Sequence, residues 1–286
     1  MGTNTLVSTN TLKTFVLLAA FGGLIMGIGS LFGQSGLVIG LVIALAVTGG
    51  SYWFSDRIAV AAARAVPLPE AEAPQLYAMV RELAARAEMP MPRLYLSPEA
   101  QPNAFATGRN PQRAVVCVTR GILEVLDPEE LRGVLAHELS HVRNRDILIG
   151  SVAAALAMVV TFLARMVMWG SLFFGGRDRE GGNILGVLAM AILAPIAALL
   201  LQMAISRSRE YEADRTGAAI IGDGEPLARA LEKIDAYARR VPMNVDPAQA
   251  SAYIVNPLTG RRVTFAQLFS THPPTEERIA RLRGRR

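Results

Sequence analysis

Two histidines spaced four residues apart are the first feature of this sequence that could perform chemistry. The segment His137-Glu138-Leu139-Ser140-His141 holds two of the three histidines in a chain of 286 residues. Residues i and i+4 lie on one face of an α-helix, so both imidazoles could reach one metal ion with Glu138 beside them. A chance pairing on a helix face is the alternative. Because histidine is scarce here and a glutamate accompanies the pair, we predict a site of the zinc-peptidase type.

A third ligand must come from elsewhere, because catalytic zinc sites normally use three protein ligands and leave a fourth position for water. The segment 209–214 offers candidates, and Glu210 is the leading one because it follows an apolar stretch closely. Asp214, four residues later on the same face, could accept a hydrogen bond from a ligand imidazole. Glu212 points about 200° away from Glu210 on a helix. Spacing alone does not choose between the two glutamates.

The chemistry expected of such a site is hydrolysis of a peptide bond. Zinc lowers the pKa of water to about 7, and Glu138 could take the proton and later pass it to the leaving amine. His272, the remaining histidine, could donate a hydrogen bond to the developing oxyanion. The alternative for His272 is a structural role in a turn, since a proline follows it.

Long apolar segments flank the candidate metal ligands and must help to position them. The chain is 51% hydrophobic with a mean hydropathy of +0.32, which indicates a membrane protein. Each apolar segment is long enough to cross a bilayer. We predict four membrane spans, at about 14–33, 36–55, 147–169 and 183–206. Residues Gly33 to Gly36 are expected to form the turn within the first pair.

The distribution of charge predicts the orientation and excludes one class of partner. Arginines lie close to the span ends on one side, which the positive-inside rule places in the cytoplasm: Arg57, Arg143, Arg145, Arg207 and Arg209. The net charge of +5 favours contact with the anionic lipid headgroups of the bilayer. Nucleic acid is not an expected partner, because the basic residues are dispersed among acidic ones. The single cysteine, Cys117, fits a reducing compartment and a buried strand.

The segments outside the spans predict a mainly α-helical protein with a small β-sheet. A helix is expected within 69–88, a strand at 93–97, and a hairpin from 103–108 and 114–119. The histidine helix should begin at Asp127, which with Glu130 forms a capping box. If that helix continues into the third span, the metal lies only one or two turns above the membrane. Further helices are expected at 225–240 and after 274.

The spans divide the chain into four parts. A membrane hairpin, 1–55, precedes a cytoplasmic part, 56–146, that holds the sheet and the two histidines. A second membrane hairpin, 147–206, precedes a second cytoplasmic part, 207–286, that holds the third ligand and the C-terminal helices.

Four of these segments together resemble the HtpX-type membrane zinc metalloproteases, which are related to the CAAX prenyl endopeptidases. The segments are 102–108, 135–141, 206–214 and His272-Pro273-Pro274. The resemblance implies a zincin-like α+β domain that binds one Zn²⁺ through His137, His141 and Glu210. It implies that Glu138 is the catalytic glutamate. It also implies that an edge strand binds an extended peptide substrate by strand addition, with residues Asn103, Ala104, Phe105 and Ala106.

The resemblance also implies a cellular role. Proteases of this type act in the cytoplasmic (inner) membrane on misfolded or damaged membrane proteins and unfolded polypeptides, in quality control and the stress response. They cut on the cytoplasmic side, in some cases within membrane protease complexes. Two alternatives remain: a prenyl-protein endopeptidase of the CAAX type, and a membrane scaffold that binds zinc without catalysis. A fourth protein ligand closing the metal site would distinguish the scaffold.

Overall fold

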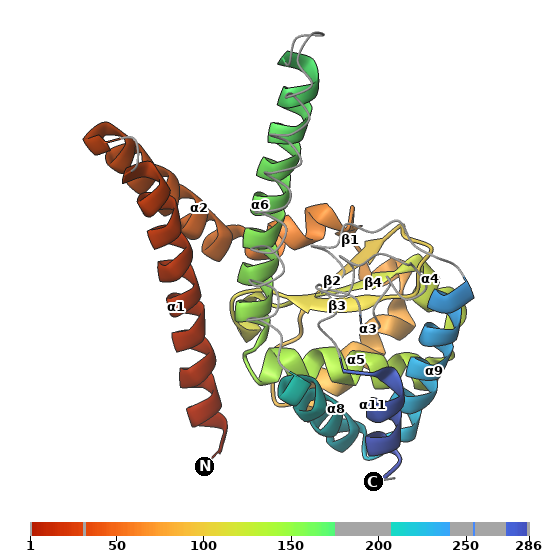
Figure 1. Ribbon diagram of the computed structural model, residues 1–286. Coiled ribbons are helices and arrows are strands. Elements are labelled where there is room, and N and C mark those ends of the chain that lie inside the picture. Colours follow the sequence, from red (N-terminus) through yellow and green to blue (C-terminus); the bar gives the residue numbers. More distant parts are fainter. Residues whose placement is uncertain (1, 31–32, 175–206, 241–253, 255–272, 285–286) are drawn as a thin grey trace.

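The computed structural model describes residues 2–30, 33–174, 207–240, 254 and 273–284. It is mostly helical with one small sheet, as predicted (Figure 1). The helices are α1 Gly2–Ser30, α2 Gly33–Ala62, α3 Pro74–Arg86, α4 Arg120–Val125, α5 Pro128–Arg143, α6 Ile147–Phe174, α8 Arg207–Ile221, α9 Glu225–Arg240 and α11 Thr275–Leu282, with short 3₁₀ turns η1 Glu70–Glu72 and η2 Pro111–Arg113.

Helices α1 and α2 form an antiparallel pair that lies beside α6, and α2 also contacts β3 (Figure 1). Small residues let the two helices approach closely: a Cβ on Gly29 would lie 2.5 Å from the carbonyl oxygen of Gly36 and 3.2 Å from Cα of Gly40. The predicted turn at 33–36 is wrong, because α2 already begins at Gly33. Gly36 lies inside the helix, and the missing side chain of Gly29 lets α1 approach its backbone carbonyl.

Three of the predicted spans fall on described helices. Residues 14–30 of the first span lie in α1, the second span lies within α2, and the third lies within α6. Among the described residues, α2 is the one helix long and apolar enough to cross a membrane, while the apolar parts of α1 and α6 are the shorter segments Thr11–Gly27 and Ile147–Val160. The fourth predicted span, 183–206, lies outside the described residues, so the count of four stays a prediction.

The sheet has four strands in the order β1-β2-β4-β3, with β3 at one edge. The strands are β1 Val66–Pro67, β2 Arg93–Ser97, β3 Ala104–Thr107 and β4 Val115–Thr119. β2 pairs parallel to β4, and β3 pairs antiparallel to β4 with Ala104 opposite Val118. The predicted strand and hairpin are therefore confirmed. Cys117 is fully buried in β4, as expected, and burial raises the pKa of its thiol to about 12.

The histidine helix α5 begins as predicted but does not continue into the third span. The Asp127 carboxylate accepts from the backbone of Glu130, and the Glu130 carboxylate accepts from the backbone of Asp127. At its other end α5 stops at Arg143, because Arg145 takes a left-handed conformation with φ of 56°. α6 then leaves at a steep angle to α5 (Figure 1). The two helices are therefore not continuous, and the turn between them gives Asp146 a position beside His141.

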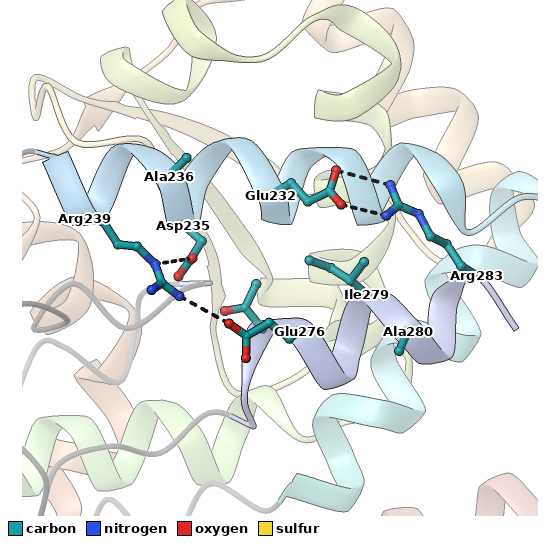
Figure 2. A pocket seen from close by; sticks show the side chains of 9 residues that line it. Glu232, Asp235, Ala236, Arg239, Glu276, Ile279, Ala280 and Arg283 are labelled. Atoms are coloured by element: carbon teal, nitrogen blue, oxygen red, sulfur yellow. Dashed lines mark hydrogen bonds and ion pairs between the residues drawn. The ribbon is translucent and has the colours of Figure 1, made fainter. Parts of the chain in front are cut away.

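Helix α5 lies at the centre of the part that contains the sheet, with the sheet on one side and α8, α9 and α11 on the other (Figure 1). Its apolar face joins one core with residues from α3, the sheet and α9. Ion pairs hold α11 onto α9 across a cavity of about 440 Å³, as Figure 2 shows: Arg283 pairs with Glu232, and Arg239 bridges Asp235 and Glu276.

Candidate metal centre

The two histidines of α5 turn their rings toward one point. Nε2 of His137 and Nε2 of His141 lie 3.2 Å apart, and the two rings are nearly perpendicular, at 88°. His137 is buried, while the side chain of His141 is 18% exposed. Two imidazole nitrogens so close together have no attraction for each other when neither carries a proton. A cation between them would use both as ligands.

Helix α8 brings Glu210 to the same point. Its carboxylate oxygens lie 3.8 Å from Nε2 of His137 and 3.6 Å from Nε2 of His141. One donor atom from each of these three residues lies within 4.8 Å of the others. Glu212 instead forms an ion pair with Arg215 on the outer face of α8. Of the two glutamates, Glu210 is therefore the one that lies beside the histidines.

Close packing between α5 and α8 sets the distance from Glu210 to the histidines. Gly217 lies two turns after Glu210 on the same face of α8. A Cβ on this glycine would lie 3.0 Å from the backbone nitrogen of His137 and 3.1 Å from its Cα. The absence of a side chain therefore lets α8 contact the backbone of the histidine helix directly.

The glutamate between the histidines faces the edge of the sheet. Glu138 is buried, and its carboxylate accepts a 2.9 Å hydrogen bond from the backbone N–H of Ala106 in β3. Burial raises the pKa of Glu138, although the neighbouring histidines oppose this shift. A carboxyl group with a raised pKa is suited to exchanging protons near neutral pH.

A carboxylate stands behind each histidine. Nδ1 of His137 lies 2.9 Å from Asp214, in the position predicted for that aspartate, and Nδ1 of His141 bonds to Asp146 at 3.0 Å. Burial alone would lower the pKa of His141, but the charge and hydrogen bond of Asp146, together with the charges of Glu210 and Glu138, outweigh it and raise the pKa to about 10. Such pairs fix the ring orientation, so that Nε2 of each histidine faces the shared point.

The buried arginine of this site was not among the residues predicted from the sequence. Arg278 of α11 is 1% exposed and donates to both oxygens of Asp214, at 2.9 and 2.7 Å. Burial would raise the pKa of Asp214, but Arg278 and His137 outweigh it and hold that pKa at about 2. The sequence did not single out Arg278, because α11 also contains Arg281 and more arginines follow it at 283, 285 and 286. Asp146 was missed as a partner of His141 because the expected continuous helix turned it elsewhere.

The residues predicted to bind substrate lie along β3, but they differ in exposure. Asn103 and Ala104 are buried, and Phe105 and Ala106 are partly buried. The Asn103 side chain accepts from the backbone of Ile254 at 3.0 Å, which indicates a structural role. His272 lies outside the described residues, so its predicted role remains a prediction.

The donor set fits a divalent metal. It combines two imidazoles with one carboxylate. The Nδ1 atom of each imidazole lies beside the carboxylate of an aspartate. This combination is typical of catalytic zinc sites with an open fourth position. In the described part of the chain, the cluster contains no fourth protein ligand.

Comparison with known proteins agrees with this geometry. The model of peptidase family M48 matches residues 70–286, about three quarters of the chain. The chain belongs to peptidase family M48. Within this family it is 59% identical over 278 residues to a protein named protease HtpX homolog from Syntrophobacter fumaroxidans, covering 95% of this chain and 98% of that protein. A protein of the same name from Ralstonia pickettii is 53% identical over 279 residues, and the match covers 96% of each of the two chains.

A solved structure supports the fold of this M48 peptidase. Ste24p of S. mikatae matches it with a TM-score of 0.50 and 20% sequence identity, over 97% of this chain and 66% of Ste24p. The family and the near full-length relatives establish the chain as a membrane-associated metallopeptidase that cleaves peptide bonds. The expected family is therefore confirmed.

Proposed function

We propose that this M48 peptidase is a zinc-dependent endopeptidase of the cytoplasmic membrane that degrades misfolded or damaged membrane proteins. The observation that carries the proposal is one arrangement of side chains. His137, His141 and Glu210 converge on one point, and Glu138 lies between that point and the edge strand β3.

The proposed ligands of one zinc ion are His137, His141 and Glu210. When bound, zinc supplies a Lewis acid that polarises a carbonyl group and makes water acidic near neutral pH. Asp214 and Asp146 hold the two imidazoles from behind through their Nδ1 atoms. Arg278 neutralises Asp214, so that this aspartate can orient His137 without adding a net charge to the buried site.

Glu138 is the proposed general base and acid. Its carboxylate lies in the turn of α5 that carries both histidines, so it can take a proton from the attacking water. The same group then returns that proton to the nitrogen of the leaving amine. Burial, which raises its pKa, favours this double role. The N–H of Ala106 keeps the carboxylate turned toward β3 before substrate arrives.

An extended polypeptide is the proposed form of the substrate. In β3 the backbone groups of Phe105 and Thr107 form hydrogen bonds with β4. The backbone groups of Ala104 and Ala106 therefore face the free edge of the sheet. A substrate strand added there lies next to Glu138. Peptides can adopt this geometry only when unfolded, which supports misfolded proteins as the substrate class.

The membrane assignment rests on α2 and on charge. α2 has the length and apolar composition to cross a bilayer, and Asp56 and Arg57 are the first charged residues after its apolar part. With four spans, the positive-inside rule supports an active site in the cytoplasm, and membrane protease complexes are proposed partners. The relatives are named protease HtpX homologs, which favours protein degradation over the prenyl-protein alternative.

The deciding experiment uses purified full-length protein with an unfolded membrane protein as substrate. Wild-type protein should lose cleavage on chelation and regain it when zinc returns. Glu138→Gln should keep the metal but cleave at least about a hundredfold more slowly. Equal cleavage by wild type and variant would refute the mechanism. A farnesylated CAAX peptide in the same assay tests the prenyl endopeptidase, and metal binding without cleavage of either substrate would support the scaffold.

A further inference from the structure

A second cavity lies where helix α2 meets the sheet. None of the residues that line it belongs to the metal centre. Its volume is about 310 Å³, within the range of small-molecule sites. The lining residues are Trp53, Phe54, Asp56, Arg57, Arg93, Arg109, Gln112 and Arg113. Four arginines and a single acidic residue therefore surround this space.

Three of the four arginines of this cavity have no carboxylate partner among the residues that the structure describes. Asp56 is engaged by Arg93, at 3.0 Å. Arg109 lies over the ring of Trp53, at 4.4 Å, and Arg57 lies over Phe54, at 5.5 Å. Within the described ranges, no carboxylate pairs with Arg57, Arg109 or Arg113. The cavity between α9 and α11 differs in this respect, because its arginines are paired with glutamates and aspartates (Figure 2).

The cavity sits at the depth expected for lipid headgroups. The sequence of α2 carries no charge from Gly33 to Ser55, and Trp53 and Phe54 are 59% and 49% exposed. Aromatic residues at the end of an apolar helix mark the membrane interface. Arg57 follows Trp53 by about 6 Å along the helix. Guanidinium groups at this level meet lipid phosphates, which they can bind through two parallel hydrogen bonds.

The cavity is also built into a rigid turn. Gly108 has φ of 131°, and a Cβ there would lie 2.6 Å from the carbonyl oxygen of Arg113. Ser151 of α6 bonds to the Thr107 hydroxyl at 2.8 Å and accepts from the N–H of Gly108 at 3.3 Å. The turn that carries Arg109 and Arg113 is thereby held by α6 as well as by β4.

We propose that this cavity binds the phosphate headgroup of an anionic phospholipid between Arg57, Arg109 and Arg113. The bound lipid would join α2 to the β3–β4 turn. That turn continues directly into β3, whose Ala106 contacts Glu138. The lipid would therefore fix the edge strand relative to the membrane. This binding does not require protease activity, so its test is independent of the proposed function.

The test counts lipid molecules bound to full-length protein in detergent by native mass spectrometry. Equal amounts of phosphatidylglycerol and phosphatidylcholine are offered together. We expect wild-type protein to prefer phosphatidylglycerol. The double variant Arg109→Gln/Arg113→Gln should reduce this preference by about thirtyfold, from about 1 kcal/mol per arginine near an anionic surface. Arg109→Lys/Arg113→Lys should retain most of it, because the charge is kept.

The matched control is Arg120→Gln/Arg229→Gln. It removes the same charge from two exposed arginines outside the cavity and should leave the preference unchanged. A wild-type protein with no preference, or equal losses in both glutamine variants, would overturn the proposal. So would displacement of the lipid by equimolar inorganic phosphate or by an acidic peptide, since the occupant would then be a soluble anion or a protein segment. Circular dichroism and a thermal unfolding midpoint equal to those of wild type show that the glutamine variant is folded.

Discussion

Arg278 of α11 forms two hydrogen bonds with Asp214 of α8, and both side chains are buried beside His137. The arginine also donates to the carbonyl of Ile254, at 3.0 Å. Helix α8, helix α11 and Ile254 are distant in sequence and thus meet on the Nδ1 side of His137, a proposed metal ligand. The pair stabilises the site only as a unit, because either charge alone would be buried without compensation.

Removing the arginine from this pair should weaken both the fold and the metal site. We expect Arg278→Met to lower the free energy of unfolding by about 3 kcal/mol, since Asp214 is left buried and unpaired. Metal affinity should fall about tenfold or more, because His137 loses its oriented partner. Chemical denaturation and metal titration measure the two effects. Arg278→Met/Asp214→Asn should recover part of the stability, whereas an additive loss would contradict this coupling.

The identity of the third ligand can be tested by two substitutions on one helix. Glu210→Gln should reduce bound zinc from about one per chain to a small fraction, because two imidazoles alone hold zinc weakly. Glu212→Gln should retain the metal, since Glu212 lies on the outer face with Arg215. Elemental analysis of the purified proteins gives the stoichiometry. Loss of metal in the Glu212 variant alone would refute the assignment.

A methyl group at Gly217 should disturb the site from a distance. Gly217→Ala places a Cβ against the backbone of His137, so α8 must move outward by a few tenths of an ångström and carry Glu210 with it. We expect weaker zinc binding even though alanine favours a helix more than glycine does. Gly150→Ala in α6 is the control, because no neighbouring atom of the described residues lies within 4 Å of its Cβ position. Unchanged zinc affinity in the first variant would show that the contact can relax.

The pair of His141 and Asp146 should make the stability of metal-free protein depend on pH. The pKa of His141 is raised from 6.5 to about 10, so its contribution is complete below pH 6.5 and is lost as pH rises through about 10. We expect the free energy of unfolding of chelated protein to fall over this range. In Asp146→Asn this component should disappear. Denaturation of both proteins at several pH values gives the difference, and parallel profiles would contradict the assignment.

The free edge of β3 can be tested by removing one backbone donor. Ala106→Pro deletes the N–H that bonds to Glu138, and proline is tolerated on an edge strand where the N–H points outward. We expect bound zinc to be retained while cleavage of an unfolded substrate falls about tenfold or more. Ala106→Ser keeps the N–H and should remain active. Similar activity in both variants would argue against substrate binding at this edge.

The sequence by itself determined the local features of this protein. The capping box of Asp127 and Glu130, the spacing of His137 and His141, and the β-strand pattern around Cys117 are written in neighbouring residues. Each depends on hydrogen bonds and periodicities within a few positions, and each is present in the structure.

Tertiary structure decided what depends on residues far apart in the chain. It selected Glu210 over Glu212, because only packing of α8 on α5 determines which face turns inward. It brought Arg278 to Asp214 across 64 positions. It also turned Asp146 toward His141, through a break at Arg145 that the expected continuous helix did not contain. Such contacts are made by the meeting of separate elements, and no local pattern in the sequence encodes which elements will meet.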